Sequence, residues 1–236
     1  MGSGKTTIGR LLSKKLNKVF YDSDSVVEEK TGVKVPLIFE YEGEIGFRKR
    51  EENVLKDLVY LENIVLATGG GIILSQNNRK LLKNNGCVIY LKSSCEDLAA
   101  RMVDDKSRPL LQKVDLKKTL ESLFEFRDPL YMSISDHIIE TKGKRTKEIT
   151  LEIIFSMLQR FLIVIVLILP FDIRDVNYDA ISLQTIPRKI GVKKTKKIGL
   201  ILLIFSLVLE YLISSSAVLK TPFMIFFFML IIFLMR

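Results

Sequence analysis

The sequence predicts an α/β fold, a parallel sheet between two layers of helices, followed by an α-helical membrane segment. Short apolar runs alternate with helical patterns through the first two thirds of the chain, which is typical of a parallel sheet covered on both faces. Glycines followed by lysine and threonine in residues 1–7 indicate a phosphate-binding loop. Long apolar runs after Arg160 indicate the membrane segment.

The composition of the 236-residue chain changes near Arg160. The net charge of +9 divides into +3 for residues 1–159 and +6 for residues 160–236. Basic residues of the second part lie between apolar runs, which favours a membrane over nucleic acid as partner. The first residues are polar, so no signal peptide is predicted. Cys87 and Cys95 fit no metal spacing and are expected to be reduced, in a cytosolic setting.

The secondary structure of residues 1–159 follows from periodicity and from end signals. The first helix has apolar residues at helical spacing, Gly32 and Gly86 end later helices, and Ser94 caps another. Strands are predicted at residues 19–21, 64–68, 87–91 and 136–140. Helices are predicted at residues 7–16, 25–30, 36–41, 44–60, 75–84, 94–102, 116–127 and 146–159.

The phosphate-binding loop is the most specific motif. Backbone N–H groups of such a loop and of the helix that follows cradle phosphates, the lysine reaches the β- and γ-phosphates, and the threonine holds Mg²⁺. The alternative is a frayed, glycine-rich N-terminus. The residues concerned are Gly2, Ser3, Gly4, Lys5, Thr6 and Thr7.

Two further candidate sites follow predicted strands, where ligands of a parallel sheet bind. Asp22 and Asp24 could hold Mg²⁺ and accept a proton from a substrate hydroxyl; the alternative is that one of them caps the next helix. Gly69, Gly70 and Gly71 let backbone approach a ligand closely, or form a plain turn.

Three arginines are weaker candidates on local grounds. Arg48 lies on a charged helix, where Lys49 and Arg50 are best explained as solvated partners of glutamates. Arg108 lies in a polar segment suited to a lid over ATP, or to an ordinary basic loop. Arg127 is predicted at a helix end, where it would also interact with the helix dipole.

Together these motifs resemble the shikimate kinase family over residues 1–159, in the family's order and nearly its spacing. The resemblance implies a three-layer P-loop fold like that of nucleoside-monophosphate kinases, and transfer of phosphate from ATP to shikimate. It implies that residues 2–7 bind ATP and that Thr6 and Asp22 help to bind Mg²⁺. It also implies that Asp24 binds substrate and acts as the base.

The remaining roles are also implied by the resemblance. Arg48, in F-R-x-x-E, and Arg127, in R-x-P-L-Y, would bind the shikimate carboxylate, while the triple glycine closes on substrate mainly through Gly70. Arg108, in R-P-L-L, would contact the ATP phosphates, and Arg101 would pack on adenine. The predicted catalytic residues are therefore Lys5, Asp24 and Arg108. Another small-metabolite kinase, of the gluconate type, is the alternative enzyme.

The N-terminus departs from the family pattern. Family members begin with an apolar strand and a glycine before G-x-G-K, whereas Met1 aligns inside the loop. In the expected strand order 2-3-1-4-5 this first strand is central, so its neighbours would lose a partner. We expect the natural start to lie upstream of Met1.

Residues 160–236 are predicted to form a membrane tail. The apolar run 161–171 is too short to span and is expected to lie in the interface or re-enter, whereas run 198–219 is long enough and run 223–235 is marginal. The basic loop between the first two runs should remain on the cytosolic side with the kinase.

Asp172, Asp175 and Asp179 share one helical face in the tail. With the following T-I-P and glycine, they resemble a fragment of UbiA-type membrane prenyltransferases, in which aspartates hold Mg²⁺ and a prenyl diphosphate. An acidic surface patch is the alternative. The sequence thus predicts a monomeric cytoplasmic kinase domain using ATP, Mg²⁺ and shikimate, with a tail in the inner membrane. An inactive membrane-bound fusion fragment is the competing hypothesis.

Overall fold

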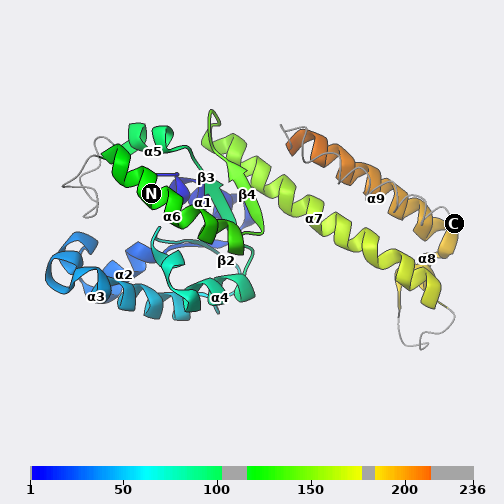
Figure 1. The fold of residues 1–236 in the computed structure, drawn as a ribbon. Coiled ribbons are helices and arrows are strands. Elements are labelled where there is room, and N and C mark those ends of the chain that lie inside the picture. Colours follow the sequence, from blue (N-terminus) through cyan, green and yellow to red (C-terminus); the bar gives the residue numbers. More distant parts are fainter. Residues whose placement is uncertain (1, 103–115, 177–183, 214–236) are drawn as a thin grey trace. The chain divides into compact units, whose positions relative to one another are not determined.

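A computed structural model describes residues 2–102, 116–176 and 184–213. The chain divides into two compact units, Met1–Leu151 and Glu152–Arg236, which we treat separately (Figure 1). The predictions for Arg108, Asp179 and the apolar run 223–235 lie outside the described residues.

The strands of the first unit form two parallel pairs. β1 (Val19–Asp22) pairs with β2 (Ile64–Ala67), with Val19 opposite Ile64. β3 (Ile89–Lys92) pairs with β4 (His137–Glu140), with Ile89 opposite His137. Among the described residues no strand joins β2 to β3, so the sheet is interrupted at the position where the resemblance places the central strand.

The helices of the first unit agree with the predicted end signals. Gly32 ends α2 with a left-handed φ of 69°. Ser75 caps α4 by accepting a hydrogen bond from the backbone N–H of Asn78, and Ser94 accepts one from that of Asp97 at the start of α5. The elements are α1 (Lys5–Leu16), α2 (Ser23–Thr31), α3 (Val35–Leu58), the 3₁₀ turn η1 (Ile72–Leu74), α4 (Gln76–Asn85), α5 (Cys95–Met102) and α6 (Leu116–Ile134).

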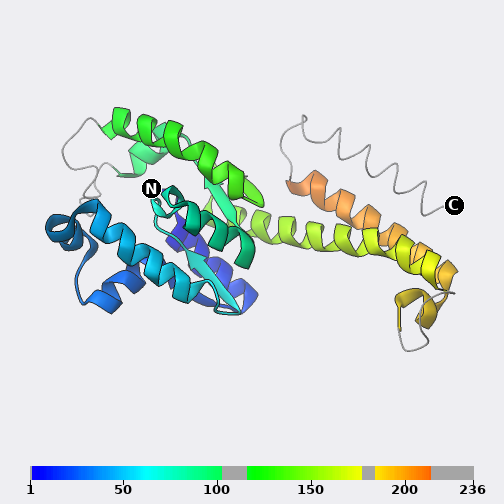
Figure 2. The ribbon, with the colours of Figure 1, turned by 60° about the horizontal axis from the view of Figure 1, so that its bottom comes forward.

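The helix α3 contains a kink at Gly43, whose φ of 67° and ψ of −175° are not helical. The kink divides the element into two helical parts, as the two predicted helices at 36–41 and 44–60 require. Figure 2 shows α2 and α3 in contact, and their facing apolar side chains form a buried cluster. Its buried members are Val27, Ile38, Phe47, Val54 and Leu58.

The helix α6 continues past Pro129 to Ile134, so the prediction that it ends at Arg127 was wrong. Proline removes one backbone donor and disfavours a helix interior. Tertiary contacts on both sides of the proline offset this loss of helix stability. Before it, Asp128 accepts hydrogen bonds from side chains of β3, and after it Ile134 is buried.

The helix α7 (Thr146–Asp175) joins the predicted helix 146–159 to the apolar run 161–171, so the prediction of two separate segments was wrong. Neither Gln159 nor Arg160 is a helix-breaking residue, so the helix continues through the junction between the two predicted segments. An 18-residue stretch of this helix has a mean hydropathy of 2.4, so by length and composition the helix could cross a membrane. It is followed in the second unit by α8 (Ile186–Ile190) and α9 (Val192–Ile213).

Candidate active site

The phosphate-binding loop is folded as an anion cradle at the start of α1. Gly2 and Gly4 have φ values of 66° and 80°, a left-handed conformation that glycine adopts without strain. Gly4 is the N-cap of α1 and no side chain caps this helix end. The first N–H groups of α1 and the positive end of its dipole therefore suit a phosphate.

A hydroxyl and a carboxylate meet beside this loop. Thr6 Oγ1 donates a 2.8 Å hydrogen bond to Asp22 Oδ2, at the end of β1. Asp22 also caps α2, since its Oδ1 accepts from the backbone N–H of Asp24 at 3.1 Å. The capping interpretation therefore holds for Asp22 without excluding a role in metal binding.

These two oxygen ligands fit Mg²⁺, which usually retains several waters and is held by one or two carboxylates together with substrate phosphates. Within the described residues there is no group of three or more His, Cys, Asp or Glu side chains that could hold a metal alone. The donor set thus suits a nucleotide-bound Mg²⁺ better than a metal held only by protein.

The glycines after β2 leave space for charged side chains. A Cβ on Gly69 would lie 2.5 Å from both Asp24 Oδ1 and Glu51 Oε1, and a Cβ on Gly71 would overlap the Arg48 guanidinium. Gly69 is also fixed by a 2.9 Å hydrogen bond from its N–H to Ser23 Oγ. Close approach, rather than a plain flexible turn, explains both glycines.

The guanidinium of Arg48 is held by two glutamates of its own helix. Nη1 donates to Glu51 Oε2 at 2.7 Å, while Nε and Nη2 donate to Glu44 Oε1 at 3.2 and 2.9 Å. Nearby Arg50 instead pairs with Glu42 on the exposed side of α3. Only Arg48 of the predicted charged stretch therefore reaches the triple glycine.

Glu51 is completely buried beside Arg48 and Asp24. Burial raises the pKa of the Glu51 carboxyl above its ordinary value of 4.5, an effect that Arg48 partly offsets. Its Oε1 has no hydrogen-bond partner in the structure. A buried carboxyl that faces the glycine turn is therefore a component of this site.

Arg127 and Tyr131 approach the triple glycine from α6. Arg127 Nη1 donates a 3.3 Å hydrogen bond to the Gly70 carbonyl, and the Tyr131 hydroxyl donates to the same oxygen. Arg127 is buried and its Nε lacks a hydrogen-bond partner. Because it lies inside α6 and not at its end, the helix-dipole interpretation of Arg127 was wrong.

A second row of contacts supports Tyr131. Its ring stacks on Tyr90, with ring centroids 4.9 Å apart, and the Tyr90 hydroxyl donates to Asp128 Oδ1 at 2.7 Å. Lys92 binds the other oxygen of Asp128 at 3.0 Å. Glu51, Tyr90, Asp128 and Tyr131 were not predicted from the sequence, although the motif F-R-x-x-E contains Glu51 and the motif R-x-P-L-Y contains Tyr131.

A cavity of about 120 Å³ lies between the phosphate loop, the glycine turn and α6. Its lining includes Lys5 from the phosphate loop, Gly69 and Gly70 after β2, and Arg127 and Tyr131 from α6. Residues that are far apart in sequence thus line one cavity, which also extends along β3 from Val88 to Leu91. Of the other predicted residues, Arg101 lies in α5, where only its backbone is described, and Arg108 lies outside the described residues.

An anion cradle, a hydroxyl–carboxylate pair and a pocket with a buried arginine define a P-loop phosphotransferase. A family model described as shikimate kinase matches residues 1–158. The chain belongs to the shikimate kinase family.

Named relatives agree with this assignment. The chain is 55% identical to a shikimate kinase of Burkholderia lata over 141 aligned residues. This alignment covers 60% of this chain and 77% of the relative. A shikimate kinase of Chromobacterium violaceum matches with the same identity and coverage.

Two solved structures have the same fold. The shikimate kinase from Acinetobacter baumannii in complex with shikimate is 44% identical, with a TM-score of 0.67, covering 68% of this chain and 89% of that one. The enzyme from Aquifex aeolicus is 38% identical, with a TM-score of 0.59, covering 66% and 91%.

Proposed function

We propose that this chain is a shikimate kinase, which transfers the γ-phosphoryl group of ATP to shikimate and forms shikimate 3-phosphate and ADP in aromatic amino-acid biosynthesis. The main support is the meeting of Arg48, Arg127 and the triple glycine beside the phosphate loop. Two arginines suit the carboxylate of the substrate, because a guanidinium forms paired hydrogen bonds with a carboxylate. The cradle suits the phosphates of ATP.

Each remaining group has a proposed role in this transfer. Asp24 accepts the proton of the shikimate hydroxyl as that oxygen attacks the γ-phosphorus and the bond to ADP breaks. Lys5 stabilises the negative charge on the transferring phosphoryl group, together with Arg108. Arg101 packs on adenine, and Gly70 closes on the substrate.

The reaction assay compares shikimate-dependent ADP release by the full chain and by two site variants. We expect Lys5→Ala and Asp24→Asn to lose nearly all activity, whereas Lys14→Ala and Asp57→Asn retain it, because Lys14 lies in the last turn of α1 and Asp57 forms an exposed pair with Lys30. Equal activity of the site and control variants would overturn the proposed roles. Phosphorylation of gluconate but not of shikimate would favour the alternative kinase.

We propose Thr6 and Asp22 as the residues that hold Mg²⁺, which when bound neutralises phosphate charge. Thr6→Val should raise the Mg²⁺ concentration needed for half-maximal activity, whereas Thr6→Ser retains the hydroxyl and should change it little. An unchanged Mg²⁺ requirement in Thr6→Val would contradict this assignment.

We further propose residues 1–159 as the kinase domain, a cytoplasmic monomer that needs no nucleic acid, and residues 160–236 as a tail in the inner membrane. If the chain were instead an inactive fusion, ATP would not protect the first unit from proteolysis and circular dichroism would show little folded structure.

The prenyltransferase-like interpretation of the tail stays a prediction. In the structure Asp175 pairs with its neighbour Arg174, and Mg²⁺-dependent binding of geranyl diphosphate would test the interpretation.

A further inference from the structure

We propose that the outer faces of α7 and α9 in the second unit form a lipid-contacting surface, which attaches the chain to an anionic bilayer. The inference rests on the proposed membrane tail. It identifies the side chains that contact lipid and the class of lipid that they prefer. It does not depend on the kinase reaction.

The outward side of both helices is apolar. Ten large apolar side chains, on α7 within the second unit and on α9 from residue 198 onward, are between 39% and 63% exposed. Such a continuous apolar surface is costly in water and marks an interaction site. Its members are Phe161, Val164, Ile168 and Phe171 on α7, and Ile198, Ile201, Ile204, Phe205, Val208 and Leu212 on α9.

Several polar groups lie on the inner side of the same helices. Gln159 Nε2 donates to Glu210 Oε2 at 2.8 Å and to the Ser206 carbonyl at 3.4 Å, which links α7 to α9. Thr195 and Ser206 are fully buried. Apolar contact between Val166 and Leu203 completes the interface.

The inner side mixes polar groups with buried apolar residues such as Val166 and Leu203, while large apolar groups lie on the outer side, where a water-soluble helix pair would present polar ones. Helices in lipid pack through small and polar residues, because acyl chains solvate Leu, Ile and Phe as well as a protein interior does. Gln159 and Glu210 satisfy each other between the helices, where lipid could not. The side chains therefore suit a hydrocarbon environment around the pair.

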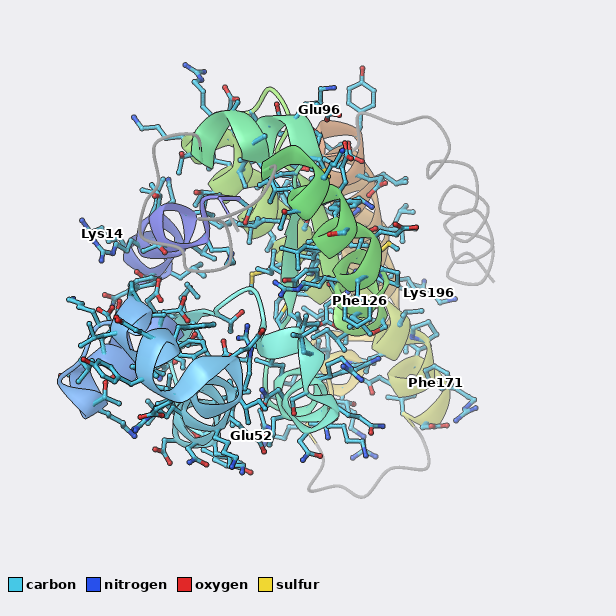
Figure 3. All side chains as sticks on the ribbon, turned by 60° about the vertical axis from the view of Figure 1, so that its left-hand side comes forward. Lys14, Glu52, Glu96, Phe126, Phe171 and Lys196 are labelled. Carbon is cyan, nitrogen blue, oxygen red and sulfur yellow. The ribbon has the colours of Figure 1, made fainter. Side chains whose placement is uncertain are left out.

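The basic residues give the attachment its lipid preference. Lys193, Lys194 and Lys197 are exposed in the first turns of α9, directly before the apolar stretch (Figure 3, where the neighbouring Lys196 and the outward Phe171 are labelled). Lysine at a helix N-terminus is unfavourable for the helix dipole, so helix stability does not explain this cluster. Lysines at the end of a lipid-embedded helix lie at headgroup level, where anionic phosphates attract them.

A second copy of the chain is the other possible cover for this surface. In a parallel pair of copies the lysine clusters would be brought together and would repel each other, whereas anionic headgroups neutralise them. The charge distribution therefore favours lipid over a parallel pair of copies.

The test is flotation of the detergent-purified full chain after dilution into vesicles, without ATP or shikimate, so a failed kinase assay leaves it valid. We expect flotation with vesicles of phosphatidylcholine and phosphatidylglycerol. With phosphatidylcholine alone we expect roughly hundredfold weaker binding, because each of the three exposed lysines near an anionic surface adds about fivefold in affinity. Equal flotation with both vesicle types would overturn the lipid preference.

Variants locate the surface. Ile201→Lys and Phe161→Lys should each reduce flotation strongly, whereas Ile45→Lys should not, because Ile45 is an equally apolar and exposed residue (76%) of the first unit. Lys193→Gln with Lys194→Gln should lower binding to anionic vesicles roughly 25-fold, whereas Lys14→Gln with Lys15→Gln should not. Equal effects of the test and control variants, or a soluble dimer that does not float, would overturn the proposal; the dimer would identify a second copy as the cover.

Discussion

The Tyr131 hydroxyl and the Arg127 guanidinium hold the same carbonyl oxygen, that of Gly70. Both donors come from α6, one helical turn apart, so the helix that carries the predicted carboxylate ligand also fixes the peptide of the glycine turn. Tyr131 is fixed in turn by stacking on Tyr90, whose hydroxyl binds Asp128. The position of Gly70 therefore depends on residues that are not expected to touch the substrate.

Tyr131→Phe should retain the stacked ring and lose the hydrogen bond to Gly70. We expect the KM for shikimate to rise roughly three- to tenfold with a smaller change in kcat, because one neutral hydrogen bond contributes about 0.5–1.5 kcal/mol. Steady-state kinetics with shikimate varied at saturating ATP measures the effect. The control is Tyr60→Phe, at an exposed tyrosine, and a KM that changes equally in both variants would contradict the role of Tyr131.

Gly71→Ala should displace the Arg48 side chain, since a Cβ would overlap its guanidinium while the glycine φ of −94° is acceptable to alanine. We expect a loss of about tenfold or more in kcat/KM for shikimate, the size of a lost charge-assisted hydrogen bond. Gly86→Ala is the matched control, because nothing lies within 4 Å of its Cβ. Full activity of Gly71→Ala would show that the position of Arg48 does not matter.

Glu44→Ala should strengthen shikimate binding. Glu44 accepts from Nε and Nη2 of Arg48, the paired donors that a substrate carboxylate would use, so the two carboxylates compete. Because Glu44 is partly exposed, we expect a modest effect, a KM up to about fivefold lower. The control Glu42→Ala breaks the exposed pair with Arg50 and should leave the KM unchanged; a raised KM in Glu44→Ala would mean that Glu44 orients Arg48 instead.

Glu51→Gln should make the stability of the first unit less dependent on pH. The pKa of Glu51 is raised in the folded protein by burial, so its contribution to stability is complete below the ordinary value of 4.5 and is lost as pH rises through the raised value. The wild-type Tm should therefore fall relative to that of the variant between pH 4.5 and neutrality. Parallel Tm curves for the two proteins would show that the pKa of Glu51 is not raised.

Much of the fold was predictable because its signals are local. The phosphate loop, the cap at Ser94 and the stop at Gly32 depend on a few neighbouring residues, and the structure has them where the sequence places them. Predictions failed where packing outweighed a local rule. Pro129 does not end α6, because Asp128 and Ile134 are held by other elements.

The sequence by itself determined the elements, the parallel strands, the anion cradle and the family motifs, since each is a pattern of adjacent residues. Only the tertiary structure decided that Arg127 and Tyr131 share the Gly70 carbonyl, that Glu51 is buried beside Asp24, and that Gln159 binds Glu210 inside the α7–α9 pair. These relationships join residues that lie far apart in the sequence. Nothing in the local pattern of charges distinguishes a buried carboxyl or arginine from a solvated one. Burial and convergence are properties of the packed chain, and they give these residues their chemistry.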